Sequence, residues 1–408
     1  MRFRSPTLLS QHLFFNRCVR SLIALVIITS VGGMLGCATS DSTRSDTTTD
    51  TSNLVWPAPP EQPRIKFVRT LFSEDQIVPP ESSLSRMRDS MLGKPSKSGR
   101  QLKKPYAVHA DNRGRVFVAD SGWGKVLVFD EQNKSFAIWG TSGKGLLSKP
   151  LGLTSDSQGN VYVTDSIKQR AVVFDANGKF LYAMGKKGEL KRPIGIAVDE
   201  KRNRIYVVDS KAHQIVVYDR AGKLVERIGK RGTESGEFNW PTNITLDGSG
   251  KIYITDSMNF RIQILKPNGT YYKAFGKNGD GRGQFVRAKG VAVNSFGHIY
   301  VSDAAFNNIQ IFNSEGELLL DIGTLGSEPG QFIIPAGIFI DKEDKIYVAD
   351  QYNFRIQVFQ YLKPDINAKK QPNLLLNKEN LQEDTAKSGK ITQQNNHHDH
   401  HYDQETQS

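Results

Sequence analysis

Cysteine and the short motifs of common enzymes are scarce in this sequence. It holds two cysteines among 408 residues, and it contains no G-x-S-x-G, no H-E-x-x-H and no C-x-x-C-H. The sequence therefore gives no support for a serine-hydrolase elbow, a zinc-protease helix or covalent haem attachment. Long apolar runs are missing as well, because the run from Leu22 to Ile28 is too short to span a bilayer comfortably.

Residues 1–36 have the composition of an export signal. They carry four basic residues and no acidic one, followed by the apolar run and then by small residues. A basic flank, a short apolar core and a small-residue exit are typical of a secretion signal. A buried core helix is the alternative, although nothing amphipathic follows the run.

The stretch Met34-Leu35-Gly36-Cys37 resembles the lipoprotein box of exported bacterial proteins. The resemblance implies acylation of Cys37, for example with palmitate, and anchoring by the acyl chains alone. Ala38 stands where aspartate would retain the protein in the inner membrane, so the outer membrane is favoured, on its periplasmic side or at the cell surface. Cys18 would leave with the signal, which excludes a disulfide in the mature chain.

Composition divides the remaining chain into three parts. Residues 37–64 are rich in Ser, Thr, Asp and Pro, and we expect a flexible tether there. Residues 65–362 carry a regular strand pattern, and residues 363–408 are polar and expected to be disordered. The tail offers one weak possibility of metal binding through its clustered histidines, which are His397, His398, His400 and His401.

A phrase of the type I-Y-V-x-D-S recurs six times along the chain. Its aspartates are spaced 45, 44, 47, 47 and 47 residues apart: Asp120, Asp165, Asp209, Asp256, Asp303 and Asp350. A fixed period in this range predicts a solenoid or a propeller. Each unit has four short apolar segments separated by turns containing glycine, which predicts four antiparallel strands. The sequence therefore predicts an all-β, six-bladed propeller; a β-helix is the alternative.

The last repeat lacks its fourth strand, and the N-terminal end of the domain has one to spare. The segment 64–72 (RIKFVRTLF) matches the pattern of a fourth strand. We expect it to complete the last blade and close the ring, because an open ring would expose strand edges. Residues 73–104 would then form an insertion before the first regular blade.

The units "FNWPTNITLDGSGKIYITDSMNFRIQIL" and "FIIPAGIFIDKEDKIYVADQYNFRIQVF" resemble the NHL repeat. With the lipoprotein box, the chain resembles an exported bacterial NHL-repeat lipoprotein. The resemblance implies a propeller, but little about function, since such propellers bind proteins, RNA or small ligands and one branch are lyases.

An enzyme of the propeller type is the alternative function. The NHL-like lyases hold zinc with histidines just after the proline that opens each inner strand. Here those positions are Tyr106, Leu151, Ile194, Thr242, Lys289 and Ala336. Calcium-dependent propellers gather oxygen ligands at the inner strand ends, where this chain offers only Asn243. We therefore expect no metal or other cofactor, and a hydrolase or lyase with a metal in the channel stays the second hypothesis.

The other polar residues of the repeats have structural interpretations. We expect the six aspartates to accept backbone N–H groups from the following turns. The basic residues five positions later could pair with them (Lys125, Arg170, Arg261 and Arg355). His109 and His213 fall in different blades, so we interpret them as a core and a surface histidine rather than as an acid–base pair.

Basic residues concentrate in four connections between repeats, at 141–150, 185–193, 229–241 and 276–290. They are Lys144, Lys149, Lys186, Lys187, Lys191, Arg192, Lys230, Arg231, Lys277, Arg282, Arg287 and Lys289. Only four acidic residues accompany these twelve, a net charge of +8 against +12 for the entire chain. In a propeller these connections emerge on one face, which favours an anionic partner. A merely solubilising surface is the alternative.

We expect Trp123, between two glycines, to stand exposed on this face as an anchor. A non-enzymatic binding scaffold is therefore the favoured function. Its expected partner is an envelope protein, an anionic polysaccharide or lipopolysaccharide. Basic loops with aromatics would also suit RNA, but the export signal argues against a nucleic acid.

Overall fold

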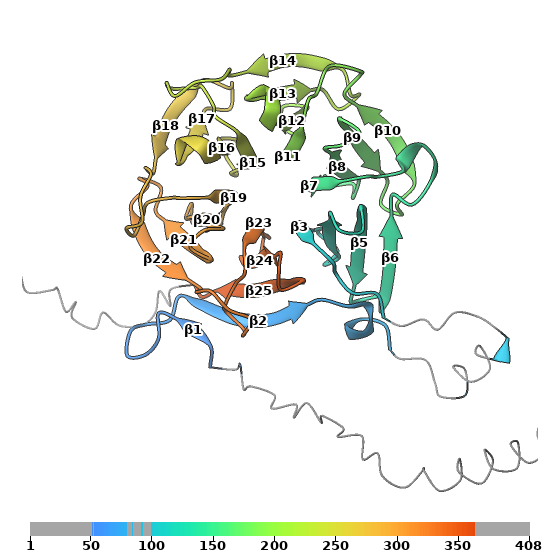
Figure 1. The fold of residues 1–408 in the computed structure, drawn as a ribbon, viewed down its shortest axis with the longest axis horizontal. Coiled ribbons are helices and arrows are strands. Elements are labelled where there is room, and N and C mark those ends of the chain that lie inside the picture. The colour runs from blue at the N-terminus through green and yellow to red at the C-terminus, as the bar shows by residue number, and fades with distance from the viewer. Residues whose placement is uncertain (1–50, 52, 80–83, 85–90, 93–98, 364–408) are drawn as a thin grey trace, which may run out of the picture. The chain divides into compact units, whose positions relative to one another are not determined.

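The computed structural model describes residues 51, 53–79, 84, 91–92 and 99–363. Its strands form six antiparallel sheets, which are arranged as blades around a central axis (Figure 1). Five sheets have four strands and one has five. The predicted six-bladed all-β propeller is confirmed, and the β-helix alternative is wrong.

Each blade is a meander whose first strand lies next to the axis. Blade 1 consists of β3 (Pro105–Ala110), β4 (Val116–Asp120), β5 (Lys125–Asp130) and β6 (Ser135–Trp139). Blade 2 consists of β7 (Pro150–Ser155), β8 (Val161–Asp165), β9 (Arg170–Phe174) and β10 (Phe180–Met184). Blade 3 consists of β11 (Pro193–Asp199), β12 (Arg204–Asp209), β13 (Gln214–Tyr218) and β14 (Leu224–Ile228).

The second half of the ring repeats this plan. Blade 4 consists of β15 (Pro241–Leu246), β16 (Ile252–Asp256), β17 (Arg261–Leu265) and β18 (Tyr271–Phe275). Blade 5 consists of β19 (Ala288–Val293), β20 (Ile299–Asp303), β21 (Asn308–Phe312) and β22 (Leu318–Ile322). Blade 6 consists of β23 (Pro335–Ile340), β24 (Lys345–Asp350), β25 (Arg355–Tyr361), β2 (Ile65–Leu71) and β1 (Val55–Trp56).

The hydrophobic core lies between neighbouring blades. The second strand of a blade is buried along its whole length, as β4 and β8 show, because both sheet faces pack against an adjacent blade. Phe117 of β4 and Phe174 of β9, for example, belong to one cluster that joins blades 1 and 2. Continuous apolar runs such as IYVVD, rather than strict alternation, are the sequence consequence.

Strand β2 closes the ring as predicted. It pairs with β25 in antiparallel register, with Ile65 opposite Tyr361 and Leu71 opposite Ile356. Ile65, Phe67 and Leu71 are buried. Figure 1 shows this N-terminal strand lying along the outside of blade 6.

The chain is structured further upstream than the sequence suggested. Strand β1 pairs with β2, with Val55 opposite Lys66 and Trp56 opposite Ile65. The Trp56 ring lies 5.7 Å from that of Phe359. The tether expected over 37–64 therefore does not extend to residue 64, because two apolar residues within it are enough to add a fifth strand.

The ends of the 73–104 insertion are held together at the base of blade 1. Ser73 and Gln101 form an isolated bridge, and a single turn of 3-10 helix, η1 (Glu74–Gln76), follows. Leu102 donates its backbone N–H to the Phe72 carbonyl at 2.8 Å and is buried. No helix in the described ranges is long and apolar enough to cross a bilayer.

Candidate binding face and central channel

The six repeat aspartates tie together the loops at one end of the ring. Each ends a second strand and is completely buried. Each accepts backbone N–H groups from the connection that precedes its blade; Asp209, for example, accepts from Lys191 and Arg192, both at 2.7 Å. Their predicted structural role is confirmed. The predicted backbone N–H groups of the following turn donate to Asp120, Asp165 and Asp303, whereas those of the preceding connection donate to all six.

Two of the four predicted partners of these aspartates pair with them. Arg261 Nε lies 2.9 Å from Asp256, and Arg355 Nε lies 2.8 Å from Asp350. The pairing predicted for Arg170 and Lys125 is wrong. Arg170 donates to the carbonyls of Lys144 and Leu146, and Lys125 donates to that of Leu147.

Competition explains the difference. In blades 1 and 2 the aspartate is already occupied by four backbone N–H groups; Asp165 accepts from Ser148, Lys149, Ile167 and Lys168. The basic side chain five positions later, Lys125 or Arg170, then donates to carbonyl oxygens of the connection and not to the aspartate. In both arrangements the connection is fixed to the blade.

Three connections share a further device, a buried phenylalanine after a glycine-containing loop. Phe238, Phe285 and Phe332 are fully buried. Gly229, at the start of the first of these connections, has a φ of +81°, and a Cβ there would lie 2.4 Å from the Phe238 ring. Only glycine fits. These loops are therefore shaped by packing.

The twelve basic residues of the four connections all lie on these ordered loops, which we call the basic face. Eleven are exposed and Lys289 is partly buried. Lys230 pairs with Glu237 at 3.2 Å, and Arg282 pairs with Asp321 at 2.7 Å. The other ten form no ion pair with any described residue. The fold thus brings the predicted residues to one end of the ring and leaves most of their charge uncompensated.

Trp123 is not the exposed anchor that the sequence suggested. It is half-buried against the core of blade 1. Its indole N–H donates to the Gln101 carbonyl at 2.8 Å, and Lys103 Nζ lies 3.8 Å above its ring. Both flanking glycines are required by close packing: a Cβ on Gly122 would lie 2.8 Å from Lys103, and a Cβ on Gly124 would lie 2.5 Å from the Ser148 carbonyl oxygen.

Other large apolar side chains are exposed at this end of the ring, and most of them were not expected from the sequence. Trp240 is 36% exposed, and its backbone N–H is held by His213 Nδ1 at 3.1 Å. The others are Leu146 and Val286 on the basic connections, Leu325 on the connection before blade 6, and Ile167, Met258, Tyr352 and Phe354 on loops between second and third strands. A hydrophobic residue outside the strands of the repeat was the available signal. His213 is buried, so its prediction as a surface histidine is wrong.

The mouth of the channel on this face is basic. Lys289 is the second residue of strand β19, at the position that follows a proline in the other blades. Its Nζ lies 5.7 Å from the Tyr106 ring centre. Burial, with the charges of Arg287 and Lys104, lowers the pKa of the Lys289 ammonium to about 8. An anion bound here would relieve the repulsion.

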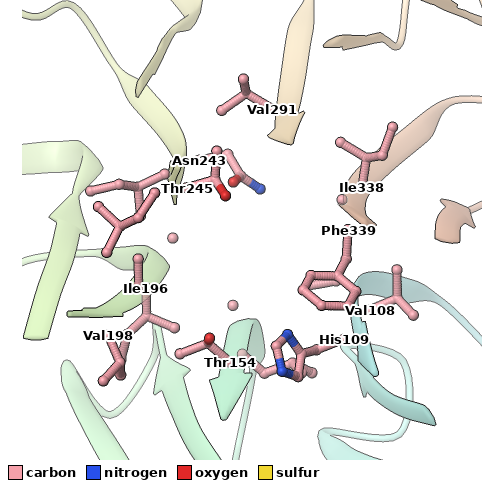
Figure 2. Close-up of a pocket in the computed structure, with 18 residues that line it drawn as sticks. Val108, His109, Thr154, Ile196, Val198, Asn243, Thr245, Val291, Ile338 and Phe339 are labelled. Atoms are coloured by element: carbon pink, nitrogen blue, oxygen red, sulfur yellow. The ribbon is translucent and has the colours of Figure 1, made fainter. Parts of the chain in front are cut away.

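A cavity of about 180 Å³ occupies the channel between the innermost strands. Figure 2 shows aliphatic side chains around it, with four polar ones, His109, Thr154, Asn243 and Thr245. Burial lowers the pKa of His109 to about 4, so its ring is neutral at pH 7. His109 is a core residue, as predicted. Across the described part of the chain, no group of three or more His, Cys, Asp or Glu is placed to hold a metal ion.

Two sets of predicted residues lie outside the described part of the chain. These are Cys37 with its signal, and the tail histidines His397, His398, His400 and His401.

Comparisons with known proteins agree on the fold. The DUF5128 family model, described as a 6-bladed β-propeller, matches residues 146–219, 190–250 and 293–381, a little under half of the chain. A search of curated proteins finds no match to this sequence.

Solved structures with a similar fold belong to proteins of different kinds. An auxiliary nutrient binding protein from Bacteroides thetaiotaomicron is 14% identical, with a TM-score of 0.51 and coverage of 65% of this chain and 70% of that one. A protein of unknown function from the same organism is 16% identical, with a TM-score of 0.50 and coverage of 64% and 70%. A virginiamycin B lyase from Staphylococcus aureus is 16% identical, with a TM-score of 0.48 and coverage of 64% and 97%. At these identities the similarity shows the fold alone.

Proposed function

We propose that this protein is a non-enzymatic binding module of the bacterial cell envelope, with NHL-type blades, that holds an anionic partner on its basic face. The observation that carries the proposal is the set of ten basic side chains that have no ion-pair partner among the described residues and lie on loops fixed by buried aspartates. Uncompensated charges attract an oppositely charged partner at long range, and loops that are already fixed lose little conformational entropy on binding. Exposed apolar residues between the charges, such as Trp240 and Tyr352, supply contact area.

The partner class follows from this surface. An anionic polysaccharide or lipopolysaccharide, or an acidic envelope protein, presents repeated negative charge to a face of this breadth. The predicted export signal favours a location outside the cytoplasm, so a nucleic acid is not proposed. The charge of the basic face fits each of these partners equally well.

The envelope location is supported by the sequence of the signal and of the lipoprotein box. Cys37→Ser is expected to leave the precursor uncleaved or to release the protein from membranes, as measured by fractionation with and without detergent. Unchanged association that still requires detergent would contradict lipid anchoring at Cys37.

The propeller-type hydrolase or lyase remains the second hypothesis from the sequence, and the channel favours it little. The cavity wall is uncharged at neutral pH apart from its mouth, and it offers a single imidazole. Elemental analysis of the purified protein without residues 363–408 would decide, because a stoichiometric metal would favour the enzyme.

The proposal is tested with lipopolysaccharide and polygalacturonate immobilised on a biosensor surface. We expect binding to at least one at physiological salt and progressive weakening as salt rises, because exposed charges are screened within about 8 Å at 0.15 M ionic strength. A neutral dextran surface is the control. Equal retention on dextran, or binding insensitive to salt, would contradict the proposal.

A further inference from the structure

The opposite end of the ring contains the larger hollow. A groove of about 870 Å³ lies over blades 6, 1 and 2 and reaches Glu200 of blade 3, mostly at the turns that join first to second strands. His109 and Phe339 line both this groove and the channel cavity, so the groove is continuous with the channel. Its volume lies within the range of about 300–1,000 Å³ that is usual for small-molecule sites.

The floor of the groove is apolar and aromatic. Phe339 of β23 is half-buried, and its ring centre lies 4.1 Å from that of His109. Val68 of the closing strand β2 is 43% exposed and lines the same groove at its outer side, with strands β24 and β25 between it and Phe339. Figure 2 shows His109 and Phe339 as neighbours at the channel wall. A flat apolar surface is thus presented at the base of a hollow.

The imidazole of His109 has one nitrogen to spare. Its Nε2 lies 2.8 Å from Ser155 Oγ and accepts the Ser155 backbone N–H at 3.2 Å. The proton of the neutral ring therefore sits on Nδ1, which has no hydrogen-bond acceptor among the described residues. Beside the aromatic floor, the groove offers an uncommitted neutral donor.

The charges of the groove largely cancel one another. Four of its six carboxylates are paired with arginine: Asp111 with Arg115 at 2.8 Å, Asp156 with Arg220, Glu200 with Arg220 at 3.2 Å, and Glu131 with Arg69. Asp341 accepts the Tyr347 hydroxyl at 3.1 Å. Paired charges are held in place but attract no particular ion, so the groove is unlike the basic face.

The rim keeps donors and acceptors free for a ligand. The side chains of Asn112, Arg113 and Gln132 form no hydrogen bond with another described residue and are exposed. The free acceptors are the amide oxygens of Asn112 and Gln132, because the carboxylate oxygens of Asp156 and Glu200 are already bonded within the protein. A rim that both donates and accepts matches hydroxyl groups, each of which does both.

We propose that this groove is a second binding site, for an uncharged saccharide of two or more units. The apolar C–H face of a sugar ring stacks on Phe339, and its hydroxyls bond to the mixed rim and to His109 Nδ1–H. An ionic ligand would gain less here than on the basic face, because four of the six carboxylates are paired with arginine and the remaining charged side chains are of both signs. The site is independent of the basic face, which lies at the other end of the channel.

The experiment is a microarray of neutral cello-, malto-, xylo- and chito-oligosaccharides probed with the full-length protein, followed by calorimetry on the best series. We expect binding of at least one series. Phe339→Ala should weaken it at least tenfold, and Asn112→Ala with Arg113→Ala several-fold. The double rim variant touches no core residue, so it separates a binding effect from misfolding.

Phe296→Ala is the matched control, because Phe296 is 49% exposed on the same end of the ring but outside the groove. It should leave saccharide binding unchanged, as should charge reversal on the basic face. Binding by no neutral series, binding that survives both groove substitutions, or capture of short peptides in place of saccharides would overturn the proposal.

Discussion

The two ends of the ring use the same residue type in different ways. At the basic face, an aspartate ends each second strand, is fully buried and binds the preceding connection. At the opposite end, which we call the turn face, an Asp or Asn follows each first strand and caps its own short turn; Asp247, for example, accepts from Ser249 and Lys251. The first arrangement holds long loops to the blade, and the second closes a short hairpin, to which Asp156 adds an ion pair with Arg220 of the next blade.

The charge of the two faces differs accordingly. The turn face comprises residues 111–115, 156–160, 199–204, 247–251, 294–298 and 341–345, with 130–134, 175–179, 219–223, 266–270 and 313–317. It carries thirteen basic and fourteen acidic residues, against twelve and four in the connections of the basic face. Because a buried carboxylate holds each long connection, the exposed residues of that connection can differ without changing its shape. The short turns contain few residues besides the capping Asp or Asn, so a ligand at the turn face must bind in the groove between blades.

The largest effect is expected from opening the ring, which should remove both faces together. A chain that begins at residue 73 lacks Ile65, Phe67 and Leu71, whose burial is worth about 1.5–3 kcal/mol each. We expect a loss of several kcal/mol in the free energy of unfolding and aggregation through the exposed edge of β25. Urea denaturation with light scattering measures both. A truncated chain that melts with the full-length protein would contradict closure by β2.

The two kinds of aspartate are compared within one blade. Asp256→Ala leaves Arg261, Gln263 and the Asn239 N–H without their buried acceptor, so we expect a loss of about 3–5 kcal/mol. Asp247→Ala removes a partly exposed turn cap and should lose about 1–2 kcal/mol. Both are read from urea denaturation. Equal losses would remove the distinction between the two ends.

Much of the fold that underlies this comparison was predictable from the sequence. The spacing of Asp120 to Asp350 fixed the number of blades, and the spare segment 64–72 identified the closing strand. The Asp165 environment was not predictable, because four backbone N–H groups from two loops converge there and exclude Arg170. Trp123 was misjudged for a similar reason: the flanking glycines suggested an open loop, but Lys103 and Lys104 pack at Gly122 and the Ser148 backbone packs at Gly124.

The groove escaped sequence reasoning altogether. It is lined by residues from four blades, including the strand β2 of blade 6, which lie up to 290 positions apart, such as Val68 and Val358. The repeat pattern also hid it, since Phe339 occupies an ordinary strand position. A cavity between repeats depends on side chains that differ from one copy to the next.

A smaller effect concerns His109, between the groove and the channel. Its folded pKa, about 4, is below the ordinary value of 6.5 because of burial. Between pH 6.5 and 4 the unfolded chain therefore binds a proton that the folded protein does not. The effect of His109 on the free energy of unfolding is absent above pH 6.5, and it destabilises the folded protein increasingly as the pH falls. Wild type should lose about 2–3 kcal/mol more than His109→Gln between pH 7 and 4.5. Parallel pH profiles would contradict a buried neutral imidazole.

The most direct measurement of the central claim reverses charge on one face at a time. The quadruple variant Lys186→Glu, Lys187→Glu, Lys191→Glu and Arg192→Glu changes exposed residues of one basic connection. The matched control, Lys134→Glu, Lys179→Glu, Lys223→Glu and Lys266→Glu, makes the same change in net charge with exposed residues of the turn face. Surface changes of this kind move stability little. Affinity for the immobilised polyanion should fall at least tenfold for the first variant and less than twofold for the control, whereas equal losses would mean that net charge alone governs binding.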